Sequence, residues 1–195
     1  YNHKVKHKTP NEWWHGQQSM EEISQMKHTS LPLHCKFHPY DDLLFVVDED
    51  AMISTYDYLQ TKSFKYSFSN GDGYKKTRVT SFKLINSQHE PMFLTGTKDR
   101  VVRLFKPDLI NFQTNKLITA FIAFSDNEKK NSSKESGLII EWDEPNEILM
   151  CAGDTGHIRV WDMTKELYKD YPTQQNSCVS SLSTHENYTV AGFGD

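Results

Sequence analysis

The sequence contains no apolar run that approaches the roughly 18–20 residues needed to cross a bilayer. Its longest apolar stretch, residues 117–124, is interrupted by Thr119. It also lacks a large excess of either charge, since 22 lysine and arginine residues stand against 26 aspartate and glutamate residues, for a net charge of −4. An integral membrane segment and nucleic-acid binding, which normally needs a basic face, are therefore disfavoured. Because the chain begins at Tyr1 and shows no signal-peptide pattern, we expect a fragment of a longer protein.

Cysteine is scarce, and the three residues present cannot all pair with one another. Cys35, Cys151 and Cys178 each lie in an apolar, strand-like stretch. We therefore expect three small, buried, unpaired side chains in the reducing environment of an intracellular protein.

Sequence signatures of catalysis are missing as well. There is no G-x-S-x-G elbow, P-loop or dinucleotide-binding glycine pattern. His34, Cys35 and His38 could suggest a metal or cysteine–histidine site, but alternate residues of a strand face opposite sides, so Cys35 would point away from both histidines. We expect a core cysteine with surface histidines, and no catalytic residue, cofactor site or metal site.

What the sequence does contain is an internal repeat. Three segments share one order: an alternating strand, a second apolar strand, a polar turn, and a third strand that ends on an aromatic residue. A fourth copy begins at Cys178 and stops inside its turn. The closing aromatic residues are Tyr56, Phe105 and Trp161, so the copies are spaced by 49 and 56 residues.

The turn between the second and third strands carries aspartate in most copies. Asp50 and Asp99 both stand six residues before the closing aromatic residue, and Asp195 holds the same place after a glycine in the fourth copy. Aspartate suits a tight turn because its carboxylate can accept backbone N–H groups. We therefore assign these three aspartates to structural turns. Thr155 departs from the pattern in the third copy.

This repeat predicts an all-β chain that forms part of a WD-repeat β-propeller, with about three and a half blades of a ring expected to have seven. A WD repeat takes about 40–45 residues, and the excess here falls in the connecting segments. An all-β sandwich is the alternative fold, but it has no reason to repeat the glycine–aspartate–aromatic spacing. Because glycine–histidine is absent and only one copy ends in Trp161-Asp162, the aspartate–histidine–serine–tryptophan network of strong WD repeats cannot be complete.

We divide the chain into an N-terminal arm, a partial propeller and one insertion. The arm, residues 1–32, would be a linker or docking segment, and the partial propeller would occupy residues 33–195. The charged, serine-rich residues 125–136 are expected to be a mobile insertion. The blades are expected at residues 33–70, 78–124, 137–172 and 178–195, the last of them incomplete.

The balance of charges on one face of this propeller indicates which kind of partner it would bind. In an antiparallel blade, the turns between the second and third strands emerge on the same face as the links to the next blade. Setting the turn aspartates aside, cations and carboxylates on that face balance, which favours protein partners over a polyanion. The cations are Lys75, Lys76, Lys98, Arg100, Lys129, Lys130 and Lys134, and the carboxylates are Asp48, Glu49, Asp72, Asp126, Glu128, Glu135 and Asp154.

A set of short segments within residues 33–195 carries a more specific likeness than the repeat itself. Among them are Lys36-Phe37-His38-Pro39, Asn70-Gly71 before Thr77-Arg78-Val79-Thr80, Leu104-Phe105-Lys106, Gly137-Leu138-Ile139-Ile140-Glu141-Trp142, Ile158-Arg159-Val160-Trp161-Asp162 and Val190-Ala191-Gly192-Phe193-Gly194-Asp195. Together they resemble the C-terminal WD-repeat propeller of the Raptor family. Residues 1–32 and 125–136 show no such likeness.

The resemblance implies a non-catalytic scaffold or adaptor subunit of target-of-rapamycin (TOR) complex 1. It implies roles in complex assembly, substrate recruitment and nutrient-dependent regulation of cell growth and autophagy. The implied partners are protein subunits of the TOR kinase complex within a larger hetero-oligomer, and the implied location is the cytoplasm with recruitment to the lysosomal or vacuolar membrane. Two alternatives stay open: a WD-repeat interaction module of another intracellular complex, and a propeller enzyme. The sequence does not indicate which residues bind a partner.

Overall fold

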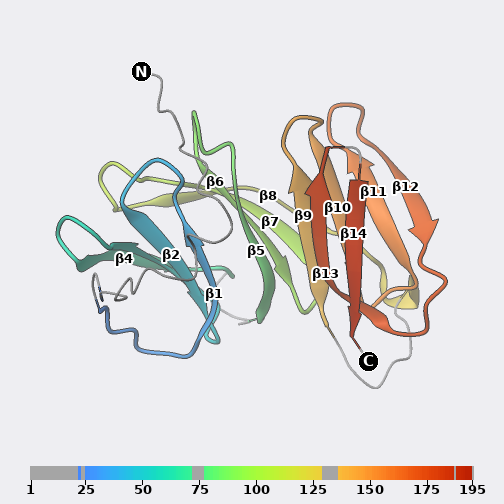
Figure 1. Ribbon diagram of the computed structural model, residues 1–195, viewed down its shortest axis with the longest axis horizontal. Helices are drawn as coiled ribbons and strands as arrows, with labels where there is room; N and C mark the ends of the chain where they lie inside the picture. Colours follow the sequence, from blue (N-terminus) through green and yellow to red (C-terminus); the bar gives the residue numbers. More distant parts are fainter. Residues whose placement is uncertain (1–21, 23–24, 72–76, 129–135, 187, 195) are drawn as a thin grey trace, which may run out of the picture.

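The computed structural model describes residues 22, 25–71, 77–128, 136–186 and 188–194, which form three four-stranded antiparallel sheets and one two-stranded sheet (Figure 1). Within each four-stranded sheet the strands lie side by side in chain order. The first sheet contains β1 (Pro32–Phe37), β2 (Leu43–Asp48), β3 (Met52–Asp57) and β4 (Ser63–Ser69). The second contains β5 (Val79–Ile85), β6 (Met92–Thr97), β7 (Val101–Pro107) and β8 (Asn115–Ile122).

The third sheet and the two-stranded sheet complete the series. A short 3₁₀ helix, η2 (Asp126–Glu128), follows β8. No helix in the described ranges is long and apolar enough to span a membrane. The third sheet contains β9 (Leu138–Asp143), β10 (Ile148–Gly153), β11 (His157–Asp162) and β12 (Leu167–Pro172), and the last sheet contains β13 (Cys178–His185) and β14 (Tyr188–Gly194).

The hydrophobic cores lie between the sheets, because successive side chains of a strand point to opposite faces. On β6, Phe93 packs with residues of the first sheet, whereas its neighbour Leu94 packs with residues of the third. On β10, Cys151 faces the second sheet and Met150 faces β13. A sheet with a neighbour on each side therefore packs through both of its faces, as the blades of a propeller do.

The first strands of the blades line up along one side of the assembly. β5 contacts both β1 and β9, and β9 contacts β13. Hydrogen bonds join these inner strands, since the Thr80 hydroxyl donates to the Leu138 carbonyl at 2.7 Å and the Ser81 hydroxyl accepts the Ile140 N–H at 3.2 Å. The blades are thus held together by polar contacts at the inner strands and by apolar side chains between the sheets.

Glycine allows one close approach between neighbouring strands of a blade. Gly153 has φ of +131°, and a Cβ atom at this position would lie 1.8 Å from the Gly137 carbonyl oxygen. Only glycine fits such a backbone without displacing the neighbouring strand. The repeated glycine of the sequence therefore marks, in the third blade, the place where β10 ends against the start of β9.

Candidate interaction surfaces

The turn of the first blade is held by a histidine that comes before the blade. The His28 imidazole contacts the Tyr56 hydroxyl through Nδ1 at 2.6 Å and the Asp48 carboxylate through Nε2 at 3.1 Å. The other oxygen of Asp48 accepts the Met52 N–H at 2.9 Å. Asp48 is buried, so this network joins the incoming chain, the turn and the third strand at one point. The sequence reasoning missed His28 because no glycine precedes it.

Two of the three aspartates assigned to turns, Asp50 and Asp99, lie in turns and have different partners. Asp50 lies in the turn after β2 and accepts a hydrogen bond from the Ser30 hydroxyl at 2.7 Å. Asp99 lies in the turn after β6, and its partners among the described residues are the hydroxyls of Thr97 and Thr77 rather than backbone N–H groups. Asp195 lies outside the described residues.

The third copy makes its turn differently. The buried Asp154 carboxylate accepts the backbone N–H groups of Ser136 and Gly137, the latter at 3.0 Å, which ties the turn to the segment that enters β9. The Thr155 hydroxyl donates to the His157 carbonyl at 2.8 Å. Asp154 therefore supplies in the third blade the backbone contacts that the pattern had assigned to a later position.

The three closing aromatic residues lie on the third strands. Tyr56 and Phe105 are buried, on β3 and β7. Trp161 on β11 is partly buried and stands edge-on to Phe121 of the second blade, with ring centroids 5.5 Å apart. Phe105 and Trp161 lie at interfaces between blades, whereas Tyr56 contacts His28 and Phe64 of its own sheet.

The prediction of a core cysteine with surface histidines around residues 34–38 is wrong. Cys35 is exposed, whereas His38 is buried and its Nδ1 accepts the Asp41 N–H at 2.9 Å. His34 is half-buried and contacts the Val79 carbonyl of the second blade at 3.3 Å, and burial lowers its pKa. The alternation was right, but the face of β1 that packs on the second blade is the histidine face. The expected burial of Cys151 and Cys178 is observed, and burial raises the pKa of the Cys151 thiol to about 12.

A buried arginine forms the densest polar cluster of the described residues. The Arg159 guanidinium donates two 2.8 Å hydrogen bonds to Asp170, one of 2.6 Å to Glu128, and one of 2.8 Å to the Ala123 carbonyl. It also lies over the rings of Phe124 and Tyr168, at 4.9 and 4.3 Å from their centroids. The sequence reasoning missed this cluster because its members come from three separate segments.

The same cluster has the composition of a cation site, but its charges are already matched. The ligand atoms of Glu128, His157 and Asp170 lie within 4.8 Å of one another. Arg159 occupies both carboxylates, and its hydrogen bonds and charge lower the pKa of Asp170. The Asp170 and Glu128 hydrogen bonds in turn raise the pKa of the guanidinium, although its burial acts in the opposite direction. A guanidinium thus stands where a metal ion would bind, so the arrangement serves to join η2, β11 and β12.

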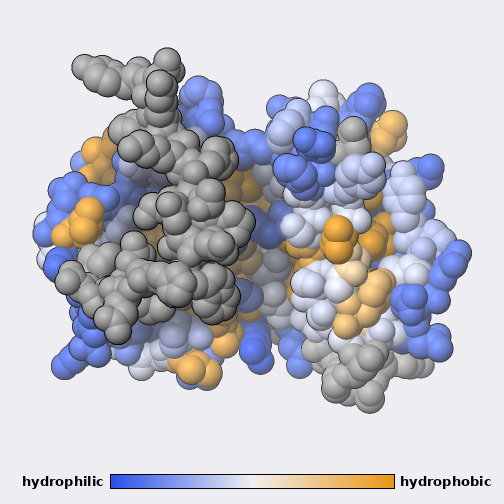
Figure 2. All heavy atoms as spheres, in the orientation of Figure 1, coloured by the Kyte–Doolittle hydropathy of each residue, from blue (hydrophilic) through white to orange (hydrophobic). Residues whose placement is uncertain are grey.

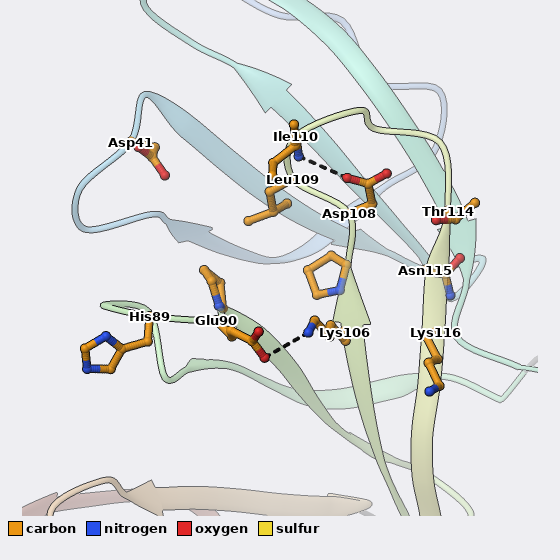
Figure 3. A pocket seen from close by; sticks show the side chains of 12 residues that line it. Asp41, His89, Glu90, Lys106, Asp108, Leu109, Ile110, Thr114, Asn115 and Lys116 are labelled. Atoms are coloured by element: carbon orange, nitrogen blue, oxygen red, sulfur yellow. Dashed lines mark hydrogen bonds and ion pairs between the residues drawn. The ribbon is translucent and has the colours of Figure 1, made fainter.

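A cleft of about 790 Å³ opens beside the loops of the first and second blades (Figure 3). Glu90 and Lys106 face each other across 2.8 Å, and Ile110 is 88 % exposed at the rim. The Asp108 carboxylate accepts the N–H groups of Asn111 and Ile110, which lowers its pKa. Both carboxylates just described are paired or engaged in a turn, and the His89 imidazole and the Lys116 amine also line the cleft.

The surface of the last sheet is apolar in places. Figure 2 shows hydrophobic side chains over β13 and β14. Tyr188 and Val190 are 75 % and 68 % exposed, and Phe193 is partly exposed. Tyr188 and Val190 lie on one face of β14 and Phe193 on the other, because alternate residues of a strand face opposite sides.

Comparison with known proteins matches this architecture to one group. No family model matches the chain. It is 32 % identical to target of rapamycin complex 1 subunit KOG1 of Saccharomyces cerevisiae over 179 residues, and 28 % identical to the raptor homologue of Dictyostelium discoideum over 168 residues. These matches cover 90 % and 83 % of this chain but only 11 % of each relative. Among solved structures, Chaetomium thermophilum Raptor superposes with a TM-score of 0.76 at 27 % identity, covering 89 % of this chain and 16 % of that one.

The chain is similar to one region of the Raptor family. The predicted resemblance is thereby confirmed. The RRP9 WD40 repeats, 13 % identical with a TM-score of 0.65, match 87 % of this chain and 47 % of that structure, which supports the fold alone. The predicted all-β, partial WD-repeat propeller is confirmed. The chain spans about a tenth of the length of the curated relatives it matches, so the similarity concerns one region of those proteins.

Proposed function

We propose that this chain is part of a non-catalytic scaffold subunit of TOR complex 1, which supports complex assembly, substrate recruitment and nutrient-dependent regulation of cell growth and autophagy. The observation that carries the proposal is the similarity over 90 % of the chain to a protein named as a subunit of that complex. The relatives are named as complex subunits or regulatory proteins, which supports a role in binding other proteins.

The chemistry of the described residues supports a scaffold rather than an enzyme. The polar clusters at Asp48, Asp154 and Arg159 are all consumed by contacts within the fold. A catalytic base or nucleophile needs a free side chain that can reach a substrate. The proposed partners are therefore the protein subunits of the TOR kinase complex, bound through loops and strand edges of the propeller.

The proposed location follows from this role. A scaffold of TOR complex 1 would lie in the cytoplasm and be recruited to the lysosomal or vacuolar membrane surface through its partners. Fluorescence microscopy of the tagged full-length protein in fed and starved cells tests this. A uniform distribution that never changes with nutrients would contradict it.

Deletion of the propeller from the full-length protein tests the scaffold function. Blades contact mainly their neighbours, so we expect the rest of the protein to stay folded. Complex assembly and nutrient-dependent signalling should weaken, whereas phosphorylation of a minimal peptide by the kinase should persist because its chemistry lies in another subunit. Unchanged assembly and signalling would contradict the proposal, and so would loss of minimal-peptide phosphorylation in an intact complex.

A further inference from the structure

The outer strand of the second blade differs from the outer strands of its neighbours. β4, β8 and β12 each pair on one side only, with β3, β7 and β11. An edge strand presents unpaired N–H and C=O groups, and proteins usually protect it with charged residues or bulges. β4 carries Lys65, and β12 carries Lys169 and Asp170.

Along β8, charge is confined to Lys116 at the start of the strand. No charged residue occurs between Lys116 and Asp126, and Leu117, Ile118 and Ile122 are 49 %, 45 % and 67 % exposed. Five consecutive residues of the strand, from residue 116 to 120, are exposed. This strand forms most of the longest apolar stretch of the sequence, and the hydrophobic cores do not account for its exposed side chains.

The outer strands β4 and β8 carry a bulge at the same place, and they differ in the residue that the bulge holds. In the first blade Thr55 pairs with Tyr66 and Tyr56 with Phe64, which leaves Lys65 as the extra residue. In the second blade Leu104 pairs with Thr119 and Phe105 with Leu117, which leaves Ile118. The equivalent bulge therefore holds a lysine on one rim and an isoleucine on the other.

We propose that β8 is a docking edge, where an extended segment of a protein partner adds to the second blade as a fifth, antiparallel strand. Such addition uses backbone hydrogen bonds for affinity and alternate side chains for specificity. Residues 119–122, beyond the bulge, form the regular stretch for pairing, and a partner with alternating branched apolar residues would cover Ile122.

The charges at the two ends of β8 determine which charged residues flank the apolar part of the partner segment and in which order they occur. Exposed Lys116 lies at the start of the strand. The far end opens into a cleft of about 600 Å³ lined by three carboxylates and two guanidinium groups, which leaves one negative charge in excess, and Asp126, which pairs with Arg100, is 95 % exposed. An antiparallel partner would thus carry a cation before its apolar residues and a carboxylate after them. The charged lining residues are Asp99, Arg100, Asp126, Glu128 and Arg159.

The same cleft has hydrogen-bond donors without acceptors among the described residues. They are the indole N–H of Trp161 and the Nε and Nη1 groups of Arg100. A buried donor left without an acceptor destabilises the fold. Backbone carbonyls of a segment that passes from β8 into the cleft would supply acceptors if the two side chains turn toward them.

A second copy of this chain fits the edge less well. When two folded blades meet edge to edge, the contact involves little more than one strand from each. The surface area buried by such a contact is far below the roughly 1,200 Å² of a stable interface. The bulge at Ile118 would also interrupt the pairing twice. A separate extended segment can pair with residues 119–122 and still enter the cleft.

Binding of a labelled peptide to the full-length protein tests the proposal. The probe is Lys-Ile-Thr-Val-Thr-Val-Thr-Glu, measured by fluorescence anisotropy. We expect saturable binding, a loss of at least tenfold in affinity for Ile118→Lys, which installs the residue that β4 carries at its bulge, and unchanged affinity for Ser67→Lys on the exposed side of β4. Thermal melting of both variants verifies that they are folded.

Two altered peptides keep the test independent of protein folding. Methylation of alternate backbone nitrogens should abolish binding, and exchange of the terminal lysine and glutamate should weaken it several-fold. Absent saturable binding, equal binding of the methylated peptide, or equal affinity for Ile118→Lys would overturn the proposal. Self-association without peptide that Ile118→Lys abolishes would overturn it in favour of a second copy. The assay involves no kinase, so its outcome is separate from that of the proposed scaffold function.

Discussion

Arg159 links the third blade to the segment that follows β8. Its side chain is 9 % exposed, and it bonds Asp170, Glu128 and the Ala123 carbonyl. Breaking a buried ion pair leaves uncompensated charge and costs about 3–5 kcal/mol. Because both carboxylates are partly exposed, we expect Arg159→Met to lower the free energy of unfolding by about 3 kcal/mol in denaturant titration of the full-length protein.

The matched control for Arg159 is an exposed ion pair. Lys165 is 70 % exposed and contacts Asp162. Exposed pairs contribute about 0–1 kcal/mol, so Lys165→Met should cost less than about 0.5 kcal/mol. Equal losses in the two variants would show that Arg159 is not a structural hub.

Asp57 makes the stability of the first blade depend on acid pH. Its carboxylate accepts hydrogen bonds from the backbone of Leu59, Gln60 and Thr61 and from the Thr61 hydroxyl. Although desolvation acts to raise its pKa, these bonds lower it from 3.8 to about 2. A carboxylate with a lowered folded pKa contributes stability above its unfolded pKa, and that contribution is lost as pH falls toward the folded value.

The prediction for Asp57 follows from that sign. Between pH 5 and pH 2 the melting temperature should fall more for the unmodified protein than for Asp57→Asn, since the variant has no carboxylate to protonate. Asp57→Asn should also be the less stable of the two at pH 7. Parallel melting curves across this pH range would contradict the role of Asp57.

At the scale of single strands, Gly153 fixes the position of β10 against β9. Its φ of +131° and the 1.8 Å approach to the Gly137 carbonyl oxygen leave no room for a side chain. Gly153→Ala should therefore destabilise the protein by more than about 3 kcal/mol, in the range reserved for severe core or backbone disruption. Gly156→Ala is the control, because a Cβ there meets nothing within 4 Å. Similar thermal melts for the two variants would refute this.

The turn after β6 offers a second comparison at this scale. Asp99 accepts hydrogen bonds from the Thr77 and Thr97 hydroxyls, which joins the incoming segment to the end of β6. Loss of these bonds in Asp99→Ala should cost about 1–2 kcal/mol. Lys98→Ala, one residue away and exposed, should cost under about 0.5 kcal/mol. Equal shifts in melting temperature for the two variants would contradict the role of Asp99 in the turn.

The sequence predicted the strands well because alternation and the repeated turn are local signals. The second and third strands of the first three copies lie where the pattern placed them, and the third strands contain Tyr56, Phe105 and Trp161. The error at Cys35 arose because alternation separates two faces without saying which one a neighbouring blade will cover. The Arg159 cluster was beyond local reasoning, since Ala123 and Glu128 reach it only when the second and third blades pack.

At the scale of the whole molecule, stability should decrease toward the last sheet when residues 1–195 are expressed alone. β13 and β14 pair only with each other, whereas each other blade has four strands. Stability in repeat proteins comes from each unit and its neighbours, and weakly supported regions open first. In hydrogen exchange of residues 1–195 expressed alone, amides of β14 should exchange at least tenfold faster than those of β6 and β10. Uniform protection would contradict this.

The cores between blades also constrain how such a chain can change over time. Phe45 and Phe93 pack with ring centroids 4.7 Å apart, although 48 residues separate them in sequence. A larger or smaller side chain at one position alters the space available at the other. A substitution in one copy of the repeat should therefore be matched by a compensating substitution about one repeat away. The copies can then diverge in sequence while the combined volume of the side chains packed between them stays the same.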